Sequence, residues 1–249
     1  SGIIQFFIYY SGSWQGQLYT NRVFRDPSAW YHFVIVVDTT QATPTERVRI
    51  YVNGQRETSF STENYPNQNQ DTDWNNSGEA MGIGVNAASF SGSFGEYYAA
   101  EMHYLDGYAY GPEYFGETND SGIWIPKEYD GSYGTNGFKI DGRDSSDLGD
   151  DESGQGNDFS TSGLASNDQM SDSPTNNWCV MNPLLNNGCT YTNGNLEVAP
   201  PNLQSTHRLV LPTMGILPSD TNKYYWEIKY LASDNTSSVN MLGIAGLNR

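Results

Sequence analysis

Two apolar stretches, residues 30–38 and 46–54, constrain the fold more than any other feature of the sequence. Both are dense in β-branched and aromatic residues, which favour strands. The second stretch alternates polar and apolar side chains and ends on Asn53-Gly54, a pair that is typical of tight β-turns. The pattern therefore predicts two antiparallel strands and, with them, a β-sandwich.

The composition supports an all-β fold. A chain of 249 residues can bury the core of one large sandwich or two small ones. It contains 18 Tyr and 26 Gly, and only 16% of its residues are charged, which fits Tyr-rich strands joined by frequent turns. Strands are predicted at residues 3–10, 17–20, 30–38, 46–53, 79–86, 97–105, 137–141, 207–211, 223–232 and 239–246.

The formal charge of −17 argues against two classes of partner. An acidic surface repels phosphate backbones and anionic membranes, so we expect no nucleic acid partner. No stretch approaches the 18 or so apolar residues of a membrane span, so we expect no membrane insertion either. Cys179 and Cys189 are the two cysteines of the sequence, and their spacing leaves open whether they are bonded.

The composition divides the chain into three parts. Residues 1–116 are predicted to form a first sandwich and residues 137–249 a second one. Between them, the composition shifts to Gly, Tyr, Pro and acidic residues from 111 to 136, and the aromatic rings there indicate that residues 117–136 are an ordered connector rather than a flexible tether. Strand-like runs lie close to both ends, so we expect the chain to be part of a longer polypeptide with an N-terminally truncated first unit.

Several motifs resemble one fold family. Residues 30–33, 48–54 and 81–84 resemble successive strands of laminin-G-like, concanavalin-A-like jelly rolls, and residues 94–107 resemble the closing strand of that family. The resemblance implies an antiparallel jelly-roll sandwich for the first unit. It implies little about a ligand, because this fold hosts lectins, glycosidases and pure interaction modules.

A second resemblance concerns function. It rests on residues 24–32, 106–107, 115–118, 131–138 and 172–177, which resemble large fibre or appendage proteins of marine bacteriophages. It implies a structural protein at the virion surface, with other copies of the chain, other virion proteins and host-cell glycans as partners. A purely structural capsid or tube decoration protein is the alternative.

The C-terminal part resembles a third family. Residues 223–229 and 241–246 are similar to the opening strands of SPRY domains, which are also concanavalin-A-like sandwiches. Only the first part of such a domain is present, so the resemblance implies a second sandwich that is incomplete. Its exposed sheet edges would need the rest of the polypeptide or another subunit.

An acidic segment, residues 150–158, resembles a turn of laminin-G-like jelly rolls. Gly154 and Gly156 permit positive φ, while Asp and Asn side chains cap neighbouring amides, which makes a compact turn without an ion. Calcium is the alternative, because it prefers hard oxygen ligands. Its ligands would be Asp151, Asn157 and Asp158.

Exposed aromatic residues are the best candidates for ligand binding. Trp14 and Trp74 fall in predicted loops, where their rings are available to stack on sugar rings. Asp71, Asp73 and Asn75 flank Trp74 and would bind sugar hydroxyls. The loops 61–78 and 88–95 are therefore predicted to attach to a host glycan, although the same tryptophans suit packing against a neighbouring subunit.

Catalysis has no evident carrier in the sequence. Glu96 and Glu101 are five residues apart, so on one regular strand their carboxylates point to opposite faces and do not form a glycosidase pair. The three histidines show no metal-ligand spacing. We therefore predict a non-enzymatic protein without a required cofactor, and a glycan depolymerase is the remaining enzymatic alternative.

Overall fold

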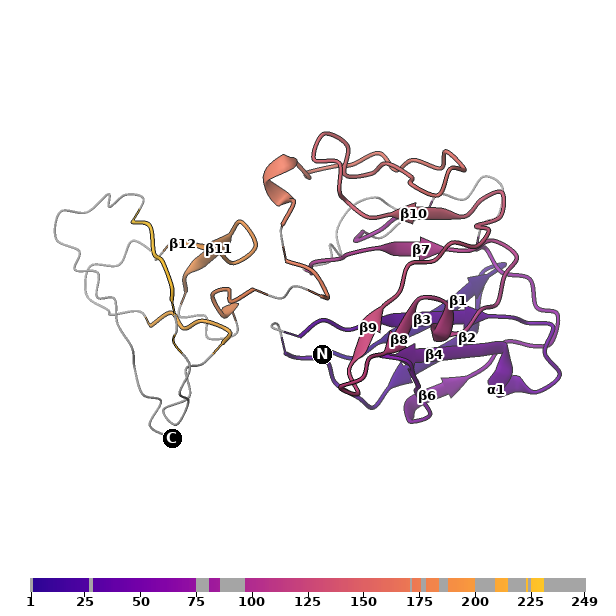
Figure 1. Cartoon of the computed structure of the whole chain (residues 1–249). Coiled ribbons are helices and arrows are strands. Elements are labelled where there is room, and N and C mark those ends of the chain that lie inside the picture. Colours follow the sequence, from indigo (N-terminus) through magenta and orange to yellow (C-terminus); the bar gives the residue numbers. More distant parts are fainter. Residues whose placement is uncertain are drawn as a thin grey trace. The chain divides into compact units, whose positions relative to one another are not determined.

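The computed structural model describes residues 2–26, 29–74, 81–85, 97–170, 172–175, 178–183, 188–199, 209–214, 223 and 225–230 (Figure 1). Its contacts divide the chain into two compact units, residues 1–178 and 179–249. Every strand pair in the described residues is antiparallel, and the helices there are single turns. The predicted all-β class with antiparallel strands is confirmed.

The first sheet of unit 1 contains β1 (Gln5–Tyr10), β2 (Ser13–Thr20) and β6 (Phe60–Asn64), in the order β1-β2-β6. Ser11 and Gly12 join β1 to β2 with positive φ angles of 49° and 81°, as a tight hairpin requires. Two expectations differ from the structure here. The strand predicted for 17–20 begins at Ser13, and residues 61–64, which we expected in an attachment loop, belong to β6.

The second sheet contains β3 (Phe33–Val37), β4 (Val48–Val52) and β5 (Gln55–Arg56). The antiparallel pairing of β3 with β4, predicted from the sequence, is confirmed and runs from Phe33 opposite Val52 to Val37 opposite Val48. The single-turn helix α1 (Pro44–Arg47) lies in their connection. Asn53 and Gly54, with φ of 49° and 77°, form the expected tight turn, which leads into β5.

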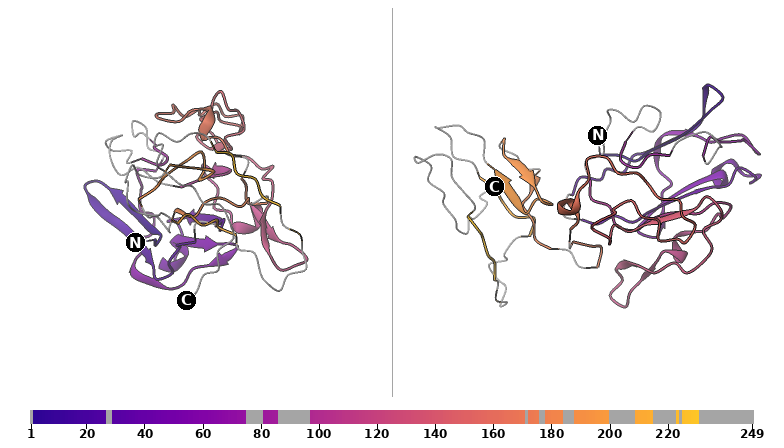
Figure 2. Two further views of the ribbon diagram at one scale, coloured as in Figure 1. Left: turned by 90° about the vertical axis from the view of Figure 1, so that its left-hand side faces the viewer. Right: turned by 90° about the horizontal axis from the view of Figure 1, so that it is seen from above.

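One core joins the two sheets. Phe6, Ile8 and Leu18 of the first sheet cluster with Val48 and Ile50 of the second, and each is at most 5% exposed. These residues alternate along their strands with more exposed ones, so each sheet presents one face to the other. Figure 2 shows these strands from two further directions.

The expected connector packs onto the first unit. Residues 116–126 form a hairpin of β8 (Gly116–Thr118) and β9 (Trp124–Pro126), preceded by the 3-10 helix η1 (Pro112–Tyr114). The Trp124 indole N–H donates a hydrogen bond to His32 Nδ1 at 3.0 Å, and the two rings stack. The aromatic rings of this segment are thus part of a packed surface, as their composition indicated.

The unit boundary lies elsewhere than we expected. β10 (Phe138–Ile140), which we assigned to the second sandwich, pairs with β7 (Met102–Tyr104) of the first unit. Tyr129 and Tyr133 are only 6% exposed, so residues beyond 116 contribute to the interior of unit 1. The contacts therefore place the boundary after Trp178, not at residues 117–136.

Unit 2 contains β11 (Thr190–Thr192) and β12 (Glu197–Ala199), which form a hairpin around Asn193 and Gly194. Both turn residues have positive φ, as an Asn-Gly turn between paired strands requires. Residues 225–230 are not in a strand, although we predicted one at 223–232, while 207–208 and 239–246 lie outside the described residues. Cys179 and Cys189 are both free thiols in the structure.

We expect the stability of unit 1 to depend on pH through His103. Its Nδ1 lies 2.8 Å from the Tyr133 hydroxyl, and the two rings stack. Burial, and then the charge of Lys139, lowers the pKa of His103 from 6.5 to about 4. The His103 imidazole takes up a proton near pH 6.5 in the unfolded chain but only near pH 4 in the folded chain. The free energy of unfolding therefore falls by about 3 kcal/mol as the pH is lowered from 6.5 to 4.

Urea unfolding at several pH values across this window measures the slope. His103→Gln keeps a polar side chain that does not titrate, so most of the slope is expected to disappear. A smaller slope remains from His32, whose pKa is also lowered by burial. An unchanged slope in His103→Gln would contradict the assignment.

Candidate functional site

Three aromatic side chains lie together on the outer face of the β1-β2-β6 sheet. Phe7, Tyr9 and Trp14 are 47%, 46% and 52% exposed. The Trp14 ring packs edge-on against both neighbours, with centroid distances of 5.0 Å to Phe7 and 4.9 Å to Tyr9. We call these three residues the aromatic platform. They hold one another in place while leaving about half of their surface to solvent.

A β-bulge places Trp14 in the platform. Ile8 lies opposite Gly16, but the next residue, Tyr9, lies opposite Trp14, so Gln15 is an extra residue in β2. On a regular strand Trp14 would share the inward face of Gly16, two residues away. The bulge reverses this and directs Trp14 outward. The Gln15 side chain fixes the bulge by donating hydrogen bonds to the Tyr10 carbonyl and the Ser13 hydroxyl.

Polar side chains continue this face beside the platform. The strand register places Phe7 opposite Gln17 and Gln17 opposite Asn64, so the three share one face in a row across the sheet. The neighbouring row contains Gln5, Tyr19 and Thr62. At a strand spacing of about 4.8 Å, each row spans about 10 Å. The face therefore combines apolar rings with amides and hydroxyls that donate and accept hydrogen bonds.

The tryptophans predicted to bind a ligand do not come together. Trp74 packs against Phe6 and Tyr104, at centroid distances of 5.6 and 6.4 Å. Phe6 points into the core and its neighbour Phe7 points outward, so Trp74 and Trp14 lie on opposite sides of β1. Trp14 lies in a strand, contrary to the prediction of a loop. Of the predicted partners, Asp71 and Asp73 precede Trp74, and Asn75 lies outside the described residues.

Residues 150–158, predicted either as a compact turn or as a calcium site, are held together by hydrogen bonds. The Asp151 carboxylate, 8% exposed as a residue, accepts them from the N–H groups of Lys139, Ser153 and Asn157 and from the Ser153 hydroxyl, at 2.8 to 2.9 Å. Asp158 in turn accepts one from the Asp151 N–H. These contacts are those of the ion-free turn, with Gly154 and Gly156 at positive φ.

The electrostatics of Asp151 follow from these contacts. Burial raises the pKa of its carboxyl, but the donors from Lys139, Asn157 and Ser153 outweigh burial and the net pKa is lowered. Within the described part of the chain, no three His, Cys, Asp or Glu side chains are placed to hold a metal ion. Calcium binding at Asp151, Asn157 and Asp158 stays a prediction.

Of the two glutamates weighed as a catalytic pair, the structure describes only Glu101. Glu101 has a φ of 51° and forms an ion pair with Arg143 at 3.2 Å, whereas Glu96 and the loop 88–95 lie outside the described residues. That the two carboxylates do not form a catalytic pair therefore stays a prediction. In the ranges that the structure describes, no helix is long and apolar enough to cross a membrane.

The platform leaves one signal in the sequence, outside the motifs from which we predicted a site. A strand with one solvent face normally alternates apolar and polar residues, but residues 6–9 are apolar or aromatic at both sets of positions. Such a strand either is covered on both faces or exposes apolar residues, and the structure shows the second case for Phe7 and Tyr9. The bulge at Gln15, which completes the platform, has no such signal.

Comparisons with known protein families, curated proteins and solved structures give no match for this chain. The chemistry of the site therefore has to follow from its own residues. Aromatic rings present a flat apolar surface, and amides and hydroxyls beside them bind hydroxyl groups. A ligand that suits both has an apolar face and polar edges, as a sugar ring has.

Proposed function

We propose that this chain is a non-enzymatic module that recognises glycans through the aromatic platform. The supporting observation is the exposure of Phe7, Tyr9 and Trp14 on one sheet face, about half in each case. Side chains of this size are usually buried on folding, so a cluster of them at the surface favours a binding role. The amide and hydroxyl rows beside the cluster support a polar, hydroxylated ligand rather than a lipid.

We further propose that the module belongs to a virion appendage and attaches the particle to a host-surface glycan. This part rests on the sequence resemblance to phage fibre and appendage proteins. The laminin-G-like jelly roll is the finer fold that we propose for unit 1, on the basis of its motifs. Weak binding at each copy is offset when many copies on one particle engage the surface together.

A glycan array, followed by calorimetric titration of the best ligand, tests the proposal. Trp14→Ala is expected to weaken binding at least tenfold, which is about 1.4 kcal/mol, because it removes the central ring of the platform. Trp178→Ala is the matched control, since Trp178 is also 52% exposed but lies outside the platform. We expect this control to bind like the parent protein.

Two outcomes would contradict the proposal. One is a blank array combined with protection of Phe7, Tyr9 and Trp14 from solvent in an assembled particle, which would favour the decoration protein. The other is release of reducing ends from a host polysaccharide, which would favour the depolymerase.

A further inference from the structure

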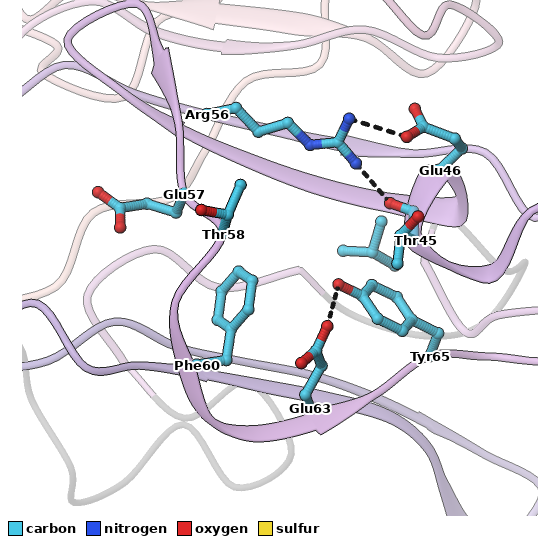
Figure 3. A pocket seen from close by; sticks show the side chains of 9 residues that line it. Thr45, Glu46, Arg56, Glu57, Thr58, Phe60, Glu63 and Tyr65 are labelled. Carbon is cyan, nitrogen blue, oxygen red and sulfur yellow. Dashed lines mark hydrogen bonds and ion pairs between the residues drawn. The ribbon is translucent and has the colours of Figure 1, made fainter.

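We propose that a pocket on the inner side of β6, separate from the aromatic platform, binds a single neutral sugar ring. The pocket has a volume of about 310 Å³ and lies between α1 and β5 on one side and β6 on the other. Figure 3 shows the lining residues: Thr45, Glu46, Val48, Arg56, Glu57, Thr58, Phe60, Glu63 and Tyr65. This volume is at the lower end of the range for small-molecule pockets, about 300 to 1,000 Å³, and suits one ring.

The pocket and the outer face of the sheet lie on opposite sides of strand β6. Thr62 lies opposite Tyr19 and Asn64 opposite Gln17, which places both on the outer face. Glu63 lies opposite the core residue Leu18 and therefore points inward. β6 is the end strand of its sheet in the described part of the chain, so the pocket and the polar rows lie on the two sides of one end strand.

The polar groups of the pocket are held in fixed orientations. Arg56 Nη1 lies 2.8 Å from Glu46 Oε1, and Arg56 Nη2 donates to the Thr45 carbonyl at 2.7 Å. The Tyr65 hydroxyl donates to Glu63 Oε1 at 3.0 Å. Burial, and then the hydrogen bond to Glu63, raises the pKa of Tyr65 to about 12, so its hydroxyl stays a donor at neutral pH. Groups that are already ordered lose less entropy when a ligand binds.

These contacts leave hydrogen-bonding capacity for a ligand. A carboxylate has about four acceptor positions, and the contacts of Glu46 with Arg56 and of Glu63 with Tyr65 each use one oxygen. The hydroxyls of Thr45 and Thr58 add groups that both donate and accept. Phe60 and Tyr65, which also pack against the core, supply the apolar surface for a ring face. This combination matches a polyhydroxylated ring.

The charge of the lining argues against an anionic ligand and leaves one carboxylate that a cation could still neutralise. Three carboxylates stand against one guanidinium in the pocket, so an anionic sugar or a phosphate would be repelled. Glu46 and Glu57 are already paired, with Arg56 and with Arg22, each at 2.8 Å, so Glu63, which accepts from the Tyr65 hydroxyl, is the lining carboxylate left for a cation. A purely apolar ligand would leave these charged groups without solvent or partners.

This sugar pocket rests on the proposal that the module recognises glycans, and it gives one unit of such a chain a second binding position. The test is an NMR titration of the whole chain with glucose, galactose, mannose and N-acetylglucosamine in turn. We expect one of them to bind with a Kd of about 1 to 10 mM, as ordinary ligand efficiency gives for about a dozen heavy atoms. The chemical-shift changes that this sugar causes in the protein should be confined to residues 45–65.

Substitutions separate this pocket from the platform. Glu63→Ala removes an acceptor from an exposed strand position, and we expect it to weaken monosaccharide binding at least tenfold. Glu117→Ala is the matched control, because Glu117 is an exposed glutamate of strand β8 outside the pocket. Trp14→Ala should leave monosaccharide binding unchanged while it weakens binding of the longer glycan to the platform.

The possible results are distinct. A Kd that rises at least tenfold in Glu63→Ala and is unchanged in Glu117→Ala and Trp14→Ala supports the pocket, whatever the glycan array shows for the platform. The absence of shifts with all four sugars at about 50 mM, well above the expected Kd, would overturn it, as would an unchanged Kd in Glu63→Ala. Binding of methylammonium in place of every neutral sugar would overturn the assigned ligand class.

Discussion

Asp151→Ala is expected to lower the free energy of unfolding by about 4 kcal/mol. The substitution leaves the N–H groups of Lys139, Ser153 and Asn157 without their acceptor, and each buried donor without a partner costs about 1 to 3 kcal/mol. The loss also reaches β10, because Lys139 is its central residue. Chemical unfolding followed by the fluorescence of the aromatic residues measures the effect.

Asp144→Ala is the matched control for this prediction. Asp144 also accepts hydrogen bonds from the N–H and hydroxyl of a serine two residues later, but it does so in a fully exposed turn. Water replaces the lost acceptor there, so a much smaller effect is expected. Equal losses in the two variants would contradict a role that depends on burial.

The same variant also bears on calcium. If residues 150–158 form a turn that needs no ion, calcium leaves the melting temperature of the parent protein unchanged. If calcium raises the melting temperature of the parent and not of Asp151→Ala, the carboxylate exchanges its N–H donors for the ion and the alternative prediction is correct.

The sequence specifies the β3–β4 pair well because local signals agree there. β-branched residues, alternation and the Asn53-Gly54 turn all favour the same antiparallel ladder, and the observed register follows. Polar strands are harder to predict from the sequence. β6 has the sequence Phe-Ser-Thr-Glu-Asn, in which only Phe and Thr favour strands, and it forms because Leu18 and Tyr19 of β2 pair with it.

The candidate site was predicted only in part for a related reason. The sequence predicts Trp14 as a ligand-binding residue, but it predicts its neighbours Phe7 and Tyr9 only as part of a strand. Whether Trp14 faces the core or solvent depends on one extra residue, Gln15, and strand propensity does not determine where a bulge forms. The role of Trp74 depends on contacts with Phe6 and Tyr104, which are distant in sequence.

Gly54→Ala is the second substitution with a large expected effect, about 3 kcal/mol of lost stability. Gly54 has a φ of 77°, where a side chain costs about 1 to 2 kcal/mol. A Cβ at Gly54 would also overlap the ring of Trp124, which packs there and against Gly116. Overpacking of this kind adds about 1 to 3 kcal/mol and would displace the indole from its hydrogen bond to His32.

Gly122→Ala isolates the two contributions. Gly122 has the same φ of 77°, but a Cβ there meets no atom within 4 Å. This control should therefore lose only the conformational part, about 1 to 2 kcal/mol. In a double-mutant cycle, Trp124→Leu should recover part of the stability lost in Gly54→Ala and none of that lost in Gly122→Ala, because the smaller side chain makes room only at Gly54. Equal unfolding free energies for the two alanine variants would show that contact with Trp124 does not select glycine at position 54.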